Sequence, residues 1–176
     1  MLHDVRPIAL VLLEQTNFIV TALTLLSILY TRSAAMLYFT AGAVVCSRIV
    51  KLMKKVFRQP RPHHPVPGKQ KKSHGMPSTH SAVITYYAAY TLLACLRLPI
   101  HSSLPASPLT RIVAPMIILP WSAIVAVSRI WLRHHTWPQV VVGCANGLVF
   151  APLWFHLWTH GASRYGYFLE QAYFVW

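Results

Sequence analysis

Five long apolar stretches, separated by short polar or proline-rich segments, run along the chain. They are Ile8–Tyr30, Ala34–Met53, Ser81–Leu98, Ile112–Ile130 and Gln139–Trp158. A helix needs about 20 apolar residues to cross a bilayer. The pattern therefore predicts an all-α integral membrane bundle of about five transmembrane helices, built by one domain over residues 1–176. The first stretch is too long for the core of a signal peptide, so we expect it to be retained.

Five antiparallel helices bring four of the stretch ends to one side of the membrane: the end of the second, the start of the third, the end of the fourth and the start of the fifth. Every unusual polar cluster of the chain lies at one of these points. The span assignment did not use those clusters. Their coincidence therefore predicts one shared site at one membrane interface.

Composition agrees with a membrane protein and adds a strong charge imbalance. Of the 176 residues, 55% are hydrophobic and only 11% are charged, and the mean hydropathy is +0.46. These values exclude a disordered chain, a coiled coil and most soluble folds. The 16 Lys and Arg against 3 Asp and Glu give a net charge of +13, which calls for an anionic lipid surface or a phosphorylated substrate. A nucleic-acid partner is excluded because such a protein would not bury its chain in lipid.

The first polar cluster follows the second stretch and runs from Lys54 to Pro62. One interpretation is a basic flank that holds the helix end against anionic lipid. The other is a phosphate ligand, because prolines on both sides of Arg61 stiffen its backbone. A stiffly held guanidinium presents a planar donor fork suited to phosphate.

The second cluster, Gly75–His80, directly precedes the third stretch. Either Ser78 or Thr79 can cap the helix that follows. A capped helix that merely contains a histidine is one interpretation. The alternative uses the free N–H groups of a helix N-terminus, which bind anions, and it places His80 at the mouth of that anion site.

The third cluster spans Ser128–Gln139, between the fourth and fifth stretches. Arg129 ends the fourth stretch, and Pro138 suits the first turn of the fifth. His135 and Gln139 are four residues apart and share a face if this turn is helical. The alternative is a pair of histidines, His134 and His135, that merely sits at the membrane surface.

Together the clusters resemble the type-2 phosphatidic acid phosphatase and haloperoxidase superfamily, whose pattern is K-x6-RP, PSGH and SR-x5-H-x3-D. The matching positions are Lys54, Arg61, Pro62, Pro77, Ser78, His80, Ser128, Arg129 and His135. The resemblance covers roughly residues 48–145. Thr79 replaces the Gly, and Gln139 replaces the closing Asp. The motifs are closest to the dolichyl-diphosphatase branch, where Gln is expected at that place.

The resemblance implies a membrane phosphatase that forms a phosphohistidine. In it, His135 is the nucleophile, and His80 protonates the leaving oxygen and then activates water. Gln139 orients His135 in place of the usual Asp. The substrate phosphate is bound by Lys54, Arg61, Ser78, Thr79 and Arg129.

The implied substrate is a membrane lipid with a phosphate or diphosphate headgroup, most closely a polyisoprenyl diphosphate. Phosphatidic acid and sphingoid phosphate are alternative substrates. A further alternative is that the protein is a catalytically degenerate relative that binds lipid without hydrolysing it. No cofactor is expected. The three acidic residues, Asp4, Glu14 and Glu170, lie far apart in sequence, so we predict no metal site and metal-independent hydrolysis.

The resemblance also implies residence in the endoplasmic reticulum membrane with the site facing the lumen. Twelve of the 16 basic residues fall on the predicted site side, which by the positive-inside rule favours a cytosolic site. The resemblance and the charge distribution thus predict opposite orientations of the site in the membrane. The sequence gives no oligomeric state.

Overall fold

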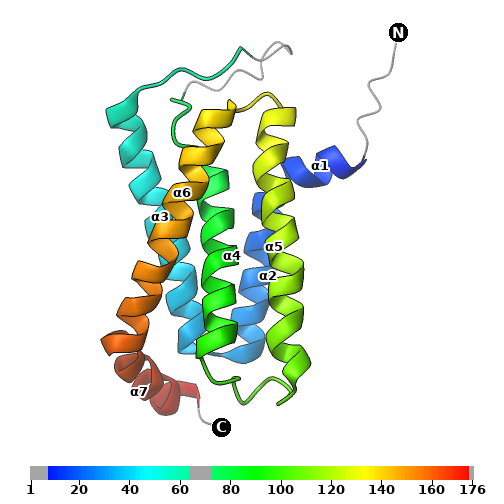
Figure 1. Ribbon diagram of the computed structural model, residues 1–176. Helices are drawn as coiled ribbons and strands as arrows, with labels where there is room; N and C mark the ends of the chain where they lie inside the picture. The colour runs from blue at the N-terminus through cyan, green and yellow to red at the C-terminus, as the bar shows by residue number, and fades with distance from the viewer. Residues whose placement is uncertain (1–7, 64–72, 175–176) are drawn as a thin grey trace.

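The computed structural model describes residues 8–63 and 73–174, and over these ranges every regular element is a helix (Figure 1). This confirms the all-α prediction. The helices are α1 (Ile8–Glu14), α2 (Thr16–Thr31), α3 (Ala34–Phe57), α4 (Thr79–Arg97), α5 (Pro108–Trp131), α6 (Trp137–Leu157), the π-helical turn η1 (Trp158–Ala162) and α7 (Ser163–Phe174).

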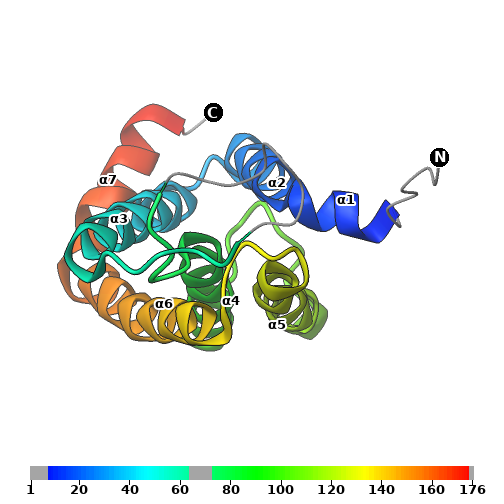
Figure 2. The same cartoon turned by 90° about the horizontal axis from the view of Figure 1, so that it is seen from above.

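The helices α2 to α6 run alternately up and down along a common axis, and α4 lies at the centre (Figures 1 and 2). α4 packs against α3, α5 and α6. Its three tyrosines, Tyr86, Tyr87 and Tyr90, are buried in an aromatic cluster with Phe39 of α3. The tyrosines thus contribute to the packed core from the central helix.

The contact between α4 and α6 depends on glycine. A Cβ at Gly143 would lie 2.6 Å from the Ser78 carbonyl oxygen, and one at Gly147 would collide with the Ala82 carbonyl oxygen. The two backbones therefore approach more closely than any larger residue allows. This contact positions the start of α4 against the start of α6.

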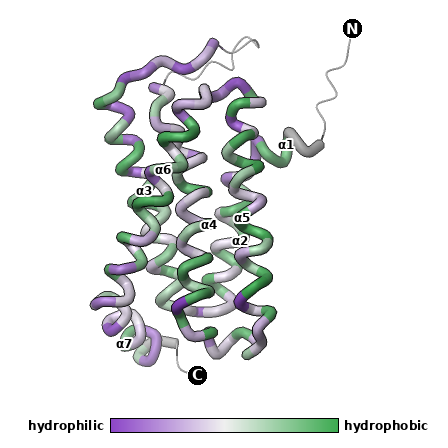
Figure 3. The backbone as a smooth tube through the Cα atoms, viewed as in Figure 1, coloured by the Kyte–Doolittle hydropathy of each residue, from purple (hydrophilic) through white to green (hydrophobic). Residues whose placement is uncertain are grey.

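Three helical segments are long and apolar enough to cross a membrane: α3, α5 and the run Trp137–Ala172, which has a kink at His160 and Gly161. α2 is a shorter apolar helix. α4 is less apolar because its neighbours cover it, so it needs less lipid-facing surface. Apolar residues predominate along the bundle, and polar residues gather toward its two ends (Figure 3). The chain is an integral membrane protein.

The prediction of one continuous helix over Ile8–Tyr30 is wrong, because the chain breaks at Gln15 between α1 and α2. The break leaves the Leu13 carbonyl without a helical partner. Two side chains satisfy it: Thr16 Oγ1 donates to it at 2.8 Å, and the guanidinium of Arg129 also donates to it. Local side-chain hydrogen bonds of this kind compete with helix continuation.

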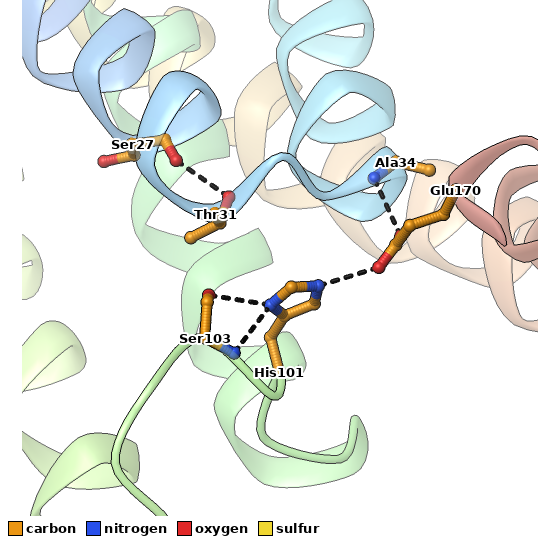
Figure 4. Close-up of polar contacts among 6 residues, drawn as sticks. All are labelled: Ser27, Thr31, Ala34, His101, Ser103 and Glu170. Carbon is orange, nitrogen blue, oxygen red and sulfur yellow. Dashed lines mark hydrogen bonds and ion pairs between the residues drawn. The ribbon is translucent and has the colours of Figure 1, made fainter. Parts of the chain in front are cut away.

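At the end of the bundle opposite the polar clusters, α7 is fastened by Glu170 (Figure 4). One carboxylate oxygen accepts from the backbone N–H of Ala34, at the start of α3, at 3.1 Å. The other contacts His101 Nε2 at 2.8 Å, and Ser103 holds the second ring nitrogen of His101 at 2.8 Å. One acidic side chain thus joins α7, α3 and the loop between α4 and α5.

Candidate active site

All three polar clusters lie at the same end of the bundle, as the antiparallel arrangement predicted. They occupy the segment after α3, the segment before α4 and the loop between α5 and α6 (Figure 1). A cavity of about 1010 Å³ begins between these segments and continues between α2 and α3, with α4 behind it. The predicted site residues that line it are Lys54, Arg61, Thr79, His80, Arg129 and His135.

His135 is buried and held by Gln139, which is only 1% exposed. His135 precedes α6, so the two residues do not share a helical turn. The contact forms across the helix start instead, with His135 Nδ1 3.2 Å from Gln139 Oε1. The same oxygen accepts from the backbone N–H of Thr136 at 3.3 Å. Gln139 Nε2 donates to Pro60 O at 2.9 Å and to Gln59 Oε1 at 3.1 Å.

These contacts assign the proton of the neutral His135 ring. Gln139 Oε1 can only accept, so Nδ1 carries the hydrogen. Nε2 then presents its lone pair, and it lies 3.0 Å from Arg61 Nη1, which can only donate. Burial, with the positive charges of Arg61 and Lys54, lowers the pKa of His135 to about 3. The ring is therefore neutral at physiological pH, and the lone pair of its Nε2 accepts a hydrogen bond from Arg61.

Arg61 is held rigidly at this position by the segment before α4 and the loop before α6. Its Nε donates to Ser73 O at 2.8 Å, its Nη2 to Ser73 Oγ at 3.0 Å and its Nη1 to His134 O at 2.9 Å. Lys54, in the last turn of α3, is buried and donates to His74 O at 3.2 Å. Carbonyl oxygens thus orient both cations without neutralising their charge.

Arg129 is the third cation at this end of the cavity and is only 2% exposed. Its guanidinium donates to Ser128 Oγ at 3.1 and 3.2 Å and also to the Leu13 carbonyl. The loop that follows folds back over it, since the backbone N–H groups of His134 and His135 both donate to Arg129 O at 3.0 and 3.1 Å. These two hydrogen bonds fix the backbone of His135 to that of Arg129.

At the start of α4, the predicted residues Ser78, Thr79 and His80 differ in whether they reach the cavity. Ser78 is the N-cap, as expected: its Oγ accepts from Ser81 N at 3.4 Å and from Ser81 Oγ at 2.9 Å. It is fully buried behind the cavity wall. Thr79 is the first helical residue, and both it and His80 line the cavity. Ser78 N donates to Gln139 O at 2.9 Å, which fixes α4 to α6 at the site.

Two further residues of the site were not predicted from the sequence. Gln59 accepts from Gln139 through its side chain, and its carbonyl accepts from Gly75 N at 2.8 Å. A Cβ at Gly75 would lie 2.5 Å from Gln139 Nε2, so the glycine makes room for the Gln139 amide. Both adjoin predicted motifs, but only the folded chain shows that they meet Gln139.

Within residues 8–63 and 73–174, no three His, Cys, Asp or Glu side chains are grouped so as to hold a metal ion. At the end of the cavity next to His135, the lining consists instead of cations, histidines and neutral donors. Such a set of donors matches an oxyanion with several negatively charged oxygens. Phosphate is the biological anion that this arrangement suits best.

The fold and the site together define a class: an integral membrane helical bundle with a cationic pocket and a buried neutral histidine at one end. The sequence pattern of the PAP2 superfamily matches residues 33–161. This chain belongs to the PAP2 superfamily.

Known relatives agree with that assignment. Dolichyldiphosphatase 1 of Rhinolophus ferrumequinum is 33% identical over 134 residues, covering 73% of this chain and 55% of the relative. The Homo sapiens protein of that name is 31% identical over the same shares. Lipid phosphate phosphatase gamma of Arabidopsis thaliana is 29% identical over 80% of this chain and 60% of its own length. This chain thus spans little more than half the length of these relatives.

A crystal structure shares the fold. It is the first transmembrane PAP2-type phosphatidylglycerolphosphate phosphatase from Bacillus subtilis, with a TM-score of 0.65 and 18% identity. The match covers 86% of this chain and 77% of that one. The helical arrangement described above is therefore that of a PAP2 membrane protein.

Proposed function

We propose that this protein is a membrane lipid-phosphate phosphatase that hydrolyses a polyisoprenyl diphosphate of the dolichyl type through a phosphohistidine. One observation carries the proposal. His135 presents the lone pair of Nε2 to a pocket that holds Lys54, Arg61 and Arg129. The name of two relatives reported above, dolichyldiphosphatase 1, supports this substrate class and residence in the endoplasmic reticulum membrane.

In the first step His135 Nε2 attacks the terminal phosphorus, and the bond from that phosphorus to the bridging oxygen breaks. The electron pair stays on the bridging oxygen, to which His80 delivers a proton. Arg61, Lys54 and Arg129 stabilise the charge on the three transferring oxygens. Gln139 keeps the Nδ1 hydrogen in place, so that the attacking nitrogen is always the deprotonated one.

In the second step His80 accepts a proton from water, which attacks the phosphorus of the phosphohistidine. The P–N bond breaks and inorganic phosphate leaves. Three cations supply the charge compensation that a metal ion would otherwise provide. We therefore propose hydrolysis without a metal.

The test is phosphate release by the purified protein in detergent with excess EDTA. The substrates are dolichyl diphosphate, phosphatidic acid and a sphingoid phosphate. We expect turnover to survive EDTA, to favour the diphosphate and to be abolished in His135→Ala. His134→Ala is the matched control: it removes the neighbouring ring and leaves the backbone carbonyl that holds Arg61, so most activity should remain.

Two results would contradict the proposal. Turnover in His135→Ala but not in His134→Ala would move the nucleophile by one residue. Absence of turnover on all three lipids by a folded sample would favour a lipid-binding relative without catalysis. A preference for phosphatidic acid or the sphingoid phosphate would keep the mechanism and replace the substrate class.

A further inference from the structure

A second row of cations on α3 runs past Lys54, with Arg48 and Lys51 on the membrane side of that residue. Arg48, Lys51 and Lys55 are three and four residues apart in turn, which places them on one face of the helix. All three line the same cavity as His135. They stand apart from the three cations grouped around His135.

Arg48 and Lys51 have no partner for their charges. Among the residues that the structure describes, neither side chain has a hydrogen-bond or ion-pair partner. Arg48 lies nine residues before the end of α3, which at 1.5 Å per residue is about 14 Å along the axis. Cations on membrane helices are costly and mark substrate pathways when they face a cavity. An anion in the cavity would satisfy both.

The wall of the cavity on α2 also carries polar side chains, among them Asn17 and Thr21, one turn apart. Farther along, the lining is mostly apolar, with Leu25 of α2 and Val44 of α3. Thr24 and Thr40 also line this section, which holds no charged side chain. The lining thus changes in order, from the His135 end through the row on α3 to an apolar section.

We propose that Arg48 and Lys51 bind the lipid-linked phosphate of a diphosphate substrate and so select diphosphates over monophosphates. This inference rests on the proposed function. The terminal phosphate occupies the pocket at His135, and the next phosphate toward the lipid lies one turn of α3 farther into the membrane. The apolar section then receives the start of the tail. A monophosphate bound at His135 leaves Arg48 and Lys51 unoccupied.

Arg48 and Lys51 also bind the leaving group of the reaction. When the bond to the terminal phosphorus breaks, the departing lipid monophosphate keeps the bridging oxygen and its electron pair. Arg48 and Lys51 hold this anion while His80 protonates it. After the lipid monophosphate has left, water takes the place of the bridging oxygen next to His80 and completes the reaction.

The experiment compares two lipids with the same polyisoprenyl tail, one a diphosphate and one a monophosphate. The ratio of their kcat/KM values is measured for the wild type, Arg48→Gln, Lys51→Gln and the double variant. We expect the ratio to fall about 10–100-fold in the double variant, as for loss of charge-assisted contacts. Arg97→Gln removes one charge at the far end of α4 and is the matched control, with an unchanged ratio.

Inorganic pyrophosphate and phosphate as competitive inhibitors give a second readout that needs no lipid. The wild type should bind pyrophosphate more tightly, and the double variant should lose that preference. Equal losses on both lipids, or an unchanged ratio in the double variant, would overturn the inference and leave the phosphatase proposal intact. A wild type that hydrolyses neither lipid would refute the proposed function itself.

Discussion

Replacing Gln139 by glutamate changes the charge beside His135 without changing the length of the side chain. The Oε1 atom of Gln139 lies 3.2 Å from His135 Nδ1 and 3.3 Å from Thr136 N. A carboxylate keeps both acceptor contacts of Oε1, loses the two contacts that Nε2 donates to Pro60 O and Gln59 Oε1, and adds a negative charge. The pKa of His135, lowered to about 3 by burial and by Arg61 and Lys54, should therefore rise.

The expected rise in the pKa of His135 follows from the distance between its ring and the new carboxylate. An opposite charge within about 4–6 Å shifts a pKa by about 1–3 units, or about 1.4–4 kcal/mol. The pKa of His135 in Gln139→Glu should then lie at about 4–6. The nucleophile is the neutral ring, so activity is lost as pH falls through this pKa. The variant should lose activity at a higher pH than the wild type does.

The assay is an NMR titration of the ring nitrogens in protein labelled with 15N-histidine, in detergent, with His135→Ala to assign the signals. Gln139→Met is the matched control, because it removes the hydrogen bond without adding charge. That bond raises the pKa of His135, so its loss should lower the value further. The pKa of His135 is thus expected to rise in Gln139→Glu and to fall in Gln139→Met. An unchanged or lowered pKa in Gln139→Glu would refute the assignment of Gln139 as the partner of Nδ1.

Three other substitutions test the rest of the structure. Arg61→Lys keeps the charge but loses the donor fork, so kcat/KM for the lipid substrate should fall about 100-fold. Gly147→Ala pushes a methyl group against the Ala82 carbonyl and should destabilise the bundle by about 1–3 kcal/mol, seen as earlier thermal unfolding in detergent. Glu170→Gln weakens a partly exposed contact with His101 and should cost less than about 1 kcal/mol, with phosphate release unchanged; a large loss of activity would link the two ends of the bundle.

Much of the fold could be predicted because membrane helices have a simple hydrophobic pattern. The long helices α3, α5 and α6 follow from length and apolar composition alone. The break at Gln15 could not be predicted in this way, because the polar run from Glu14 to Asn17 is only four residues long and lies between two apolar segments. It is stabilised by Arg129, a residue more than 100 positions away in the chain.

The site was predictable to the extent that its motifs are local in sequence. Topology alone brought Lys54, Arg61, His80 and His135 to one end, and the structure places all four on one cavity. Ser78 shows the limit of this reasoning. Spacing identifies it as a motif residue, but only the folded chain shows its hydroxyl turned to Ser81 behind the cavity wall.

The replacement of a carboxylate by Gln139 is consistent with the charge balance of this pocket. In the free protein His135 is neutral, so a buried carboxylate beside it would have no cationic ring to stabilise. Positive charge develops on the ring only when it is phosphorylated, and the phosphoryl group then brings negative charge of its own. Gln139 can therefore fix the proton on Nδ1 without placing a negative charge beside Arg61 and Lys54. A glutamine in this place preserves the orientation of the nucleophile and leaves the full positive charge of the pocket to bind phosphate.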